Sequence, residues 1–188
     1  MKLCAPLLLV SAQRVQTIDL IRLRCIQFYD EGCTIYIMDK LKHTRPGYHQ
    51  NALQLPKYVA DEKLCVINCL KEYRKGTATL RSKCDKLLEC YSKPHGPASK
   101  DTVSRWVKCV LKMADIQKFE PQSFRGASSM AMLNNGLSFD VFFLRTAGEF
   151  NATTFKRFYD KPVVNSEITK KVTSKQHTIL RYAVKSVK

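Results

Sequence analysis

An arginine near the expected start of a helix stands out because cations are uncommon at that position. Arg125 opens the stretch 125–133, which has the composition of a helix and ends at the sequence Asn-Asn-Gly. The positive end of the helix dipole repels a cation there, and a bound anion would remove the conflict. A guanidinium group suits a phosphate because it donates paired hydrogen bonds and keeps its charge. Arg125 therefore points to an anion site.

The charge of the whole chain favours the same class of ligand. The 188 residues include 32 Lys and Arg against 16 Asp and Glu, a formal net charge of +16. Such an excess favours nucleic acid, because released counterions drive the association, with an anionic membrane surface as the alternative. No stretch is long enough for a transmembrane helix. The composition, 45% hydrophobic and 26% charged, fits one soluble globular domain.

The eight cysteines show no spacing typical of a metal site. No Cys-x-x-Cys pair occurs, and no Cys/His cluster has zinc spacing. Cys65 and Cys69 would share a helix face beside apolar residues, and Cys109 lies in an apolar run. We therefore expect buried thiols of an intracellular protein, with no metal and no disulfide framework.

The elements expected in the first half are helices flanking a pair of strands. An apolar helix is predicted over 3–10, and the helical pattern continues over 17–23. Residues 33–38 are rich in β-branched and aromatic side chains and predict a strand, to which 51–55 would pair back after a turn. An amphipathic helix is predicted over 64–75, ended by Gly76.

The first helix has an alternative interpretation. Lys2 and the apolar run resemble a signal peptide, with a cleavage-like site near Ala12. The run is short and Pro6 interrupts it, so we expect a helix of the core.

The second half is predicted to be mainly helical. Residues 87–91 could form a third short strand, and Ser99 can cap a helix that buries its Trp106 to Leu111 side. After the helix at 125–133, the composition predicts helices over 139–146 and 151–159 and a basic tail from Asn165. The fold class is therefore α+β, mostly α-helical with a small antiparallel β-sheet.

Four polar stretches resemble a known set of active-site segments. They are SAQRVQT (11–17), residues 93–106, PQSFRGASS (121–129) and AGEFNATTFKRFY (147–159). Their order and spacing resemble those of tyrosine recombinases, also called phage-integrase-type enzymes, most closely those carried by eukaryotic mobile elements. The resemblance spans about positions 3–162. It implies a catalytic core of the DNA breaking-rejoining type over 1–164, followed by a basic tail over 165–188.

The resemblance also implies residue roles. Arg14 and Arg125 match the two arginines that stabilise the phosphorane transition state, and Tyr159 matches the nucleophile. Lys42 is the best match for the general acid, with Lys40 as a substitute if the hairpin register differs. The family uses no metal and no nucleotide cofactor.

Two positions depart from the family pattern. Gln122 stands where the family usually has histidine, and Glu149 where it has tryptophan or histidine. Glutamine can donate a hydrogen bond but cannot shuttle protons near neutral pH, and a carboxylate repels a phosphate. We therefore expect catalysis to be impaired.

Further basic residues are expected along the phosphate backbone of double-stranded DNA, although a solvated face is the simpler alternative for them. They are Lys40, Arg45, Lys100, Arg105 and Lys108. The catalytic residues have simpler alternatives too: Arg14 as a surface arginine, Lys42 as part of a basic loop, and Tyr159 as a core aromatic residue.

The function expected from this resemblance is DNA strand cleavage and rejoining through a 3′-phosphotyrosine in recombination or integration, in the nucleus. The family works as a homo-tetramer on paired DNA sites, and its N-terminal clamp domain has no counterpart in this sequence. The first alternative is a non-enzymatic DNA-binding protein descended from such an enzyme. A second alternative is a small secreted cysteine-containing protein.

Overall fold

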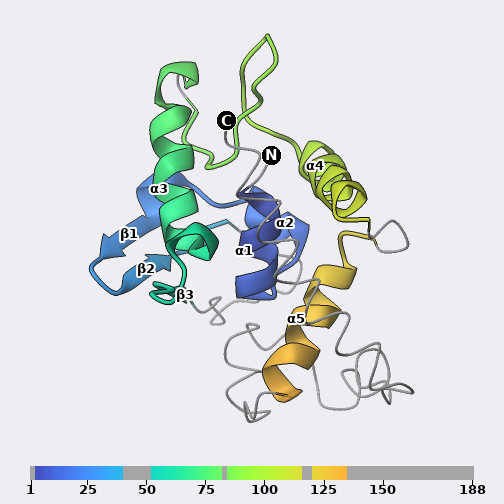
Figure 1. The fold of residues 1–188 in the computed structure, drawn as a ribbon. Helices are drawn as coiled ribbons and strands as arrows, with labels where there is room; N and C mark the ends of the chain where they lie inside the picture. Colours follow the sequence, from blue (N-terminus) through green and yellow to red (C-terminus); the bar gives the residue numbers. More distant parts are fainter. Residues whose placement is uncertain (1–2, 40–51, 82–83, 116–119, 135–188) are drawn as a thin grey trace.

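The fold is a set of helices around one central helix, with a small sheet on one side (Figure 1). The structure is a computed structural model, and it describes residues 3–39, 52–81, 84–115 and 120–134. Its helices are α1 (Cys4–Ser11), α2 (Val15–Asp19), α3 (Val66–Gly76), α4 (Lys100–Met113) and α5 (Ser123–Asn134). Its strands are β1 (Ile26–Tyr29), β2 (Gly32–Ile35) and β3 (Leu53–Pro56), and short 3-10 turns occupy Leu23–Cys25, Glu62–Leu64 and Ala78–Leu80.

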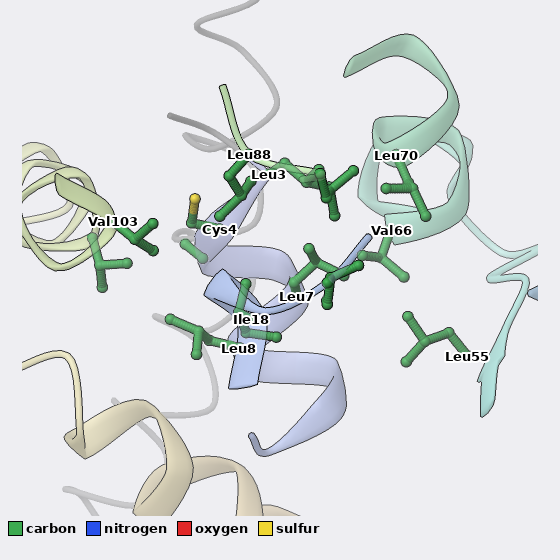
Figure 2. Packing of buried hydrophobic residues seen from close by; sticks show 14 of the residues in the cluster. Leu3, Cys4, Leu7, Leu8, Ile18, Leu55, Val66, Leu70, Leu88 and Val103 are labelled. Atoms are coloured by element: carbon green, nitrogen blue, oxygen red, sulfur yellow. The ribbon is translucent and has the colours of Figure 1, made fainter. Parts of the chain in front are cut away.

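Helix α1 is the centre of the core, as its uniformly apolar sequence predicts. Leu3, Leu7 and Leu8 are completely buried, and α1 contacts each of the other α-helices within the described residues as well as β3. Figure 2 shows side chains from α2, α3, β3 and α4 packed around it. The helix ends at Ala12, whose φ of 53° is left-handed and whose N–H donates to the Leu8 carbonyl at 3.0 Å. The prediction of a core helix at this end of the chain is therefore confirmed.

The three strands form an antiparallel sheet in the order β1-β2-β3. Ile35 of β2 pairs with Ile26 on one side and Leu53 on the other. Gly32 is required where β2 meets β3, because a Cβ there would collide with the carbonyl oxygen of Leu55. The predicted pairing of 33–38 with 51–55 is confirmed, although both strands are shorter than predicted, with β2 starting one residue earlier and β3 ending one residue later.

The predicted third strand at 87–91 is wrong, and β1 takes its place in the sheet. The segment pairs with two different neighbours instead of one. The Leu87 N–H donates to Ile21 at 2.8 Å, whereas the Cys90 N–H donates to Gly96 at 2.8 Å. Such a segment forms isolated bridges, because a strand needs consecutive pairs with the same partner.

Helices α3, α4 and α5 confirm the predicted helices, with small shifts of their ends. Ser99 caps α4 as expected, since its hydroxyl accepts the Thr102 N–H at 3.2 Å. Val103, Val107, Val110 and Leu111 are buried on one side of α4, and Trp106 is half-buried beside them.

The exposure of Cys109 differs from the prediction made for the thiols. It was predicted to be buried, and it is exposed because it lies on the side of α4 opposite its buried residues. Cys65 is buried and Cys69 half-buried, and all eight cysteines are free.

Figure 1 places the sheet and α3 on one side of α1 and α2, and α4 and α5 on the other. None of the helices in the described ranges has the length and apolar character needed to cross a membrane. The predicted boundary between a catalytic domain and a basic tail, at 164, lies outside the described residues, as do the helices predicted over 139–146 and 151–159.

Candidate active site

Arg14 stands in the turn between the central helix and α2. Its backbone is extended, and its carbonyl oxygen accepts the N–H groups of Thr17 at 3.0 Å and Ile18 at 3.2 Å. The preceding Gln13 is buried, and its N–H donates to the Ser11 hydroxyl at 3.3 Å. Arg14 itself is half-buried. The end of α1 and the start of α2 therefore fix its backbone on both sides.

Arg125 lies in the first turn of α5, two residues after the helix begins at Ser123. Its side chain belongs to the core face of the helix, with only 3% exposed. Its N–H donates to the carbonyl of Gln122 at 3.2 Å, and Gln122 is exposed just before the helix. A guanidinium this deeply buried needs polar or anionic neighbours, because it cannot lose its charge.

The elements that carry the two arginines meet at the same helix. Arg14 follows the carboxyl end of α1, and α5, which carries Arg125, packs against α1. The structure thus brings together the elements that carry both predicted arginines and the predicted Gln122. Lys42, Glu149 and Tyr159, the other predicted catalytic residues, lie outside the described residues.

Buried polar side chains gather on these same elements. Ser11 and Gln13 are buried at the end of α1, and Arg125, Ser128 and Ser129 are buried on α5. Residues three and four positions apart share a helix face, so both serines lie on the face of Arg125. The hydroxyls of Ser128 and Ser129 have no hydrogen-bond partner. Ser128 and Ser129 were not among the site residues predicted from the sequence, although their spacing from Arg125 was a usable signal.

The basic residues predicted on α4 are exposed, as DNA contacts require. Lys100, Arg105 and Lys108 are all exposed, and the unpredicted Lys112 continues the row one turn after Lys108. Lys108 pairs with Glu120 at 2.8 Å, so one of these charges is partly neutralised. Lys40 and Arg45, the other predicted DNA contacts, lie outside the described residues.

Metal binding has no visible basis in the described part of the chain, where no cluster of three His, Cys, Asp or Glu side chains occurs. Burial raises the pKa of the Cys4 thiol to about 12 and that of the Cys33 thiol to about 11. These thiols are therefore protonated and unreactive near neutral pH.

Comparison with known proteins gives matches among solved structures alone. No protein-family model and no curated protein matches the chain. The structure is similar to that of XerA recombinase, with a TM-score of 0.63 and 15% identity over 92% of this chain and 56% of that one. It is also similar to XerH site-specific recombinase, solved in a pre-cleavage complex with its difH substrate, with a TM-score of 0.62 and 14% identity over 85% of this chain and 42% of that one.

The chain thus spans about half the length of each of these recombinases. At such low identity the likeness establishes the fold and leaves the activity open. The chain has the α+β fold of a tyrosine recombinase catalytic domain, mostly helical with a small antiparallel sheet.

Proposed function

We propose that this chain is a DNA-binding domain that cleaves and rejoins DNA strands by the tyrosine recombinase mechanism, with a weakened active site. The observation that carries the proposal is that α5, the helix of Arg125, packs against α1, the helix that precedes Arg14, within a recombinase-like fold. The two residues were singled out from the sequence, and no general folding rule requires that the elements carrying two such distant arginines pack together.

The proposed reaction needs two arginines, a tyrosine and a lysine. The Tyr159 oxygen attacks a DNA phosphorus, the bond from phosphorus to the 5′-oxygen breaks, and a 3′-phosphotyrosine forms. Arg14 and Arg125 donate hydrogen bonds to the non-bridging oxygens, whose negative charge grows in the transition state. Lys42 gives a proton to the leaving 5′-oxygen. A 5′-hydroxyl later attacks the phosphotyrosine and releases the tyrosine.

Gln122 and Glu149 are expected to slow this reaction. At about 4 Å, with an effective dielectric constant near 20, a carboxylate repels a phosphate charge by roughly 4 kcal/mol. That energy corresponds to a rate loss of roughly a thousandfold if Glu149 faces the phosphate. Gln122 lies immediately before α5 and is exposed. Its amide group can donate a hydrogen bond, but it cannot give up a proton.

Double-stranded DNA is the proposed partner. The net charge of +16 and the exposed basic row on α4 support it, and XerH was solved with a DNA substrate. We extend the proposal to a homo-tetramer on paired DNA sites, with the basic tail 165–188 docking on a neighbouring subunit. A nuclear location and an origin in a eukaryotic mobile element belong to the same proposal.

The test is covalent trapping. The protein is incubated with nicked duplexes from which the cleaved 5′-end diffuses away, and the products are separated under denaturing conditions. We expect a protein–DNA adduct that is lost in Tyr159→Phe and kept in the control Tyr91→Phe, since Tyr91 is exposed on a loop outside the proposed site. An adduct that survives Tyr159→Phe contradicts the assignment of the nucleophile.

A non-enzymatic DNA-binding protein is the second candidate, favoured by Gln122 and Glu149. Its signature would be salt-sensitive duplex binding without an adduct on any nicked duplex. Adduct formation by the unsubstituted protein would exclude it.

A further inference from the structure

The buried face of α5 is mostly polar. Among the described side chains of this helix, the buried ones are Phe124, Arg125, Ser128 and Ser129, each with 3% or less of its surface exposed. A helix face that packs on a core is normally apolar, because a buried polar group destabilises the fold unless it is hydrogen-bonded. The polar character of this face therefore needs an explanation other than packing.

The two serines do not use the partner that their own helix offers. A serine within a helix can donate its hydroxyl to the carbonyl four residues earlier. Ser104 of α4 does so toward Lys100 at 3.0 Å, and Ser11 of α1 makes the equivalent bond. The hydroxyls of Ser128 and Ser129 make no such bond, and they have no other hydrogen-bond partner in the part of the chain that the structure describes. Both donors are thus left for a group outside the helix.

The serines lie close to Arg125 on the buried face. They follow it by three and four residues, and side chains of a helix point toward its N-terminal end. Both hydroxyls therefore lean toward the first turn, which carries Arg125. A guanidinium group only donates hydrogen bonds, and each hydroxyl has one hydrogen to donate. Such a set of donors matches a ligand that brings acceptors, as the oxygens of a phosphate do.

Burial does not separate the serines from the arginine. Arg125 and Ser128 have the same exposed fraction, 3%, and Ser129 is completely buried. The proposed reaction already requires a phosphate to reach the Arg125 guanidinium. A phosphate in that position lies within one helical turn of both hydroxyls.

We propose that the hydroxyls of Ser128 and Ser129 donate hydrogen bonds to the non-bridging oxygens of the phosphate that Arg125 binds. This inference rests on the proposed function and deepens it by adding two catalytic residues to the site. The non-bridging oxygens gain negative charge in the transition state, so donors aimed at them speed the reaction. A partnerless hydroxyl destabilises the free protein, as residues that serve a ligand often do.

The test replaces one non-bridging oxygen at a time. Three nicked duplexes are compared, one with the ordinary scissile phosphate and two with a methylphosphonate there, one in each configuration. Each methylphosphonate has a methyl group in place of one of the two oxygens, and a methyl group accepts no hydrogen bond. The rate of adduct formation by Ser128→Ala and by Ser129→Ala is measured relative to that of the unsubstituted protein on the same duplex.

We expect each variant to be slower on the ordinary phosphate by roughly tenfold to a hundredfold, because a hydrogen bond to a charged group is lost. On the methylphosphonate that lacks the oxygen bound by that hydroxyl, the variant should lie within about twofold of the unsubstituted protein. On the other configuration the loss should remain. A defect in the fold would slow all three reactions alike.

Ser104→Ala is the matched control. It makes the same change at a hydroxyl that is bonded within α4, so it should keep all three rates within about twofold. Thermal unfolding gives a second readout. Ser128→Ala and Ser129→Ala should be at least as stable as the unsubstituted protein, because each removes a hydroxyl that has no partner. Slower chemistry in a protein that is no less stable separates a role in the reaction from a role in the fold.

An unchanged rate on the ordinary phosphate in the double variant Ser128→Ala with Ser129→Ala overturns this inference, and would mean that the hydroxyls bond water or another part of the chain. Equal losses on all three duplexes in both single variants overturn it as well. Either result leaves the proposed function standing, because the unsubstituted protein forms its adduct in both cases. Absence of an adduct between the unsubstituted protein and the ordinary duplex overturns the proposed function and this inference together.

Discussion

Tyr73 and Glu89 are joined by two hydrogen bonds between a side chain and the backbone. The Tyr73 hydroxyl donates to the Glu89 carbonyl at 3.3 Å and accepts the Glu89 N–H at 3.0 Å. The bonds connect α3 to the irregular segment that replaces the predicted third strand. Arg81 supports the same segment by donating to the carbonyls of Lys86 and Leu87, each at 2.5 Å.

Removing the Tyr73 hydroxyl should therefore destabilise the fold. We expect Tyr73→Phe to lower the free energy of unfolding by about 1–3 kcal/mol, because the Glu89 N–H loses its partner. Urea unfolding followed by circular dichroism measures the change. Tyr91→Phe is the control, since its ring is 60% exposed, and should change stability by less than about 0.5 kcal/mol. If Tyr73→Phe left the free energy of unfolding unchanged, another group would have to accept a hydrogen bond from the Glu89 N–H.

Tyr73 should also make stability depend on alkaline pH. Burial raises its pKa from 10.0 to about 12, so the unfolded chain loses this proton first as the pH rises. The contribution is fully present below pH 10 and is lost between about pH 10 and 12. We expect the stability difference between the unsubstituted protein and Tyr73→Phe to shrink over this range by about 2 kcal/mol. A difference that stays constant to pH 12 contradicts the raised pKa.

For the buried serines of α5 we expect the opposite effect, because removing a hydroxyl there should stabilise the fold. Ser129 is completely buried, and its hydroxyl lacks a partner, so Ser129→Ala should raise the free energy of unfolding by about 0.5–1.5 kcal/mol. Ser104→Ala on α4 is a matched control whose hydroxyl donates to the Lys100 carbonyl at 3.0 Å. It should change stability by less than about 0.5 kcal/mol. A clear loss in Ser129→Ala would show that its hydroxyl is bonded in solution.

Thiol reactivity should follow exposure. Cys109 is exposed on α4, whereas Cys4 and Cys33 are buried with raised pKa values. We expect a thiol reagent to modify Cys109 first in the folded protein, and a Cys109→Ser variant to lose this fast phase. All eight thiols should react after unfolding without reductant. Fewer than eight would indicate a disulfide and support the secreted alternative.

The basic row on α4 predicts how DNA affinity depends on salt. Arg105→Gln should weaken duplex binding and reduce the slope of log affinity against log salt by about one, since one phosphate contact is lost. Lys75→Gln is the control, because Lys75 is exposed on α3, a helix that lies on the other side of α1 from α4 (Figure 1). Titrations by fluorescence anisotropy at several salt concentrations measure both slopes. Equal effects of the two substitutions would argue against a specific basic face.

The sequence was most informative where one residue pattern had a single structural solution. Helix α4 combines a serine cap with apolar residues at helical spacing, and its start after Ser99 and its buried side were both predicted. Helix α1 is apolar on every side, which only the centre of the core accommodates. The packing of α5, which carries Arg125, against the helix that precedes Arg14 was implied by the family resemblance alone, because no local pattern relates residues so far apart.

The errors arose where pairing between segments decided the structure. Strand β1 contains the strand-forming residues Ile26, Phe28 and Tyr29, but it is only four residues long and begins directly after a 3-10 turn, so its pairing with β2 is what identifies it as a strand. Residues 87–91 have a strand-like composition, yet their hydrogen bonds go to two partners. The ion pair of Arg22 with Asp39 joins residues that are 17 positions apart, and no pattern in the sequence around either residue predicts it.

Gly32 couples the sheet to the centre of the molecule. Even a methyl group at this position would drive β3 outward, since it would occupy the space of the Leu55 carbonyl. Leu53 and Leu55 would be withdrawn from the core that α1 anchors. A substitution in the sheet would thus disturb the helix that precedes Arg14 and supports α5 with Arg125, and loss of function at position 32 would be a defect of scaffolding rather than of chemistry.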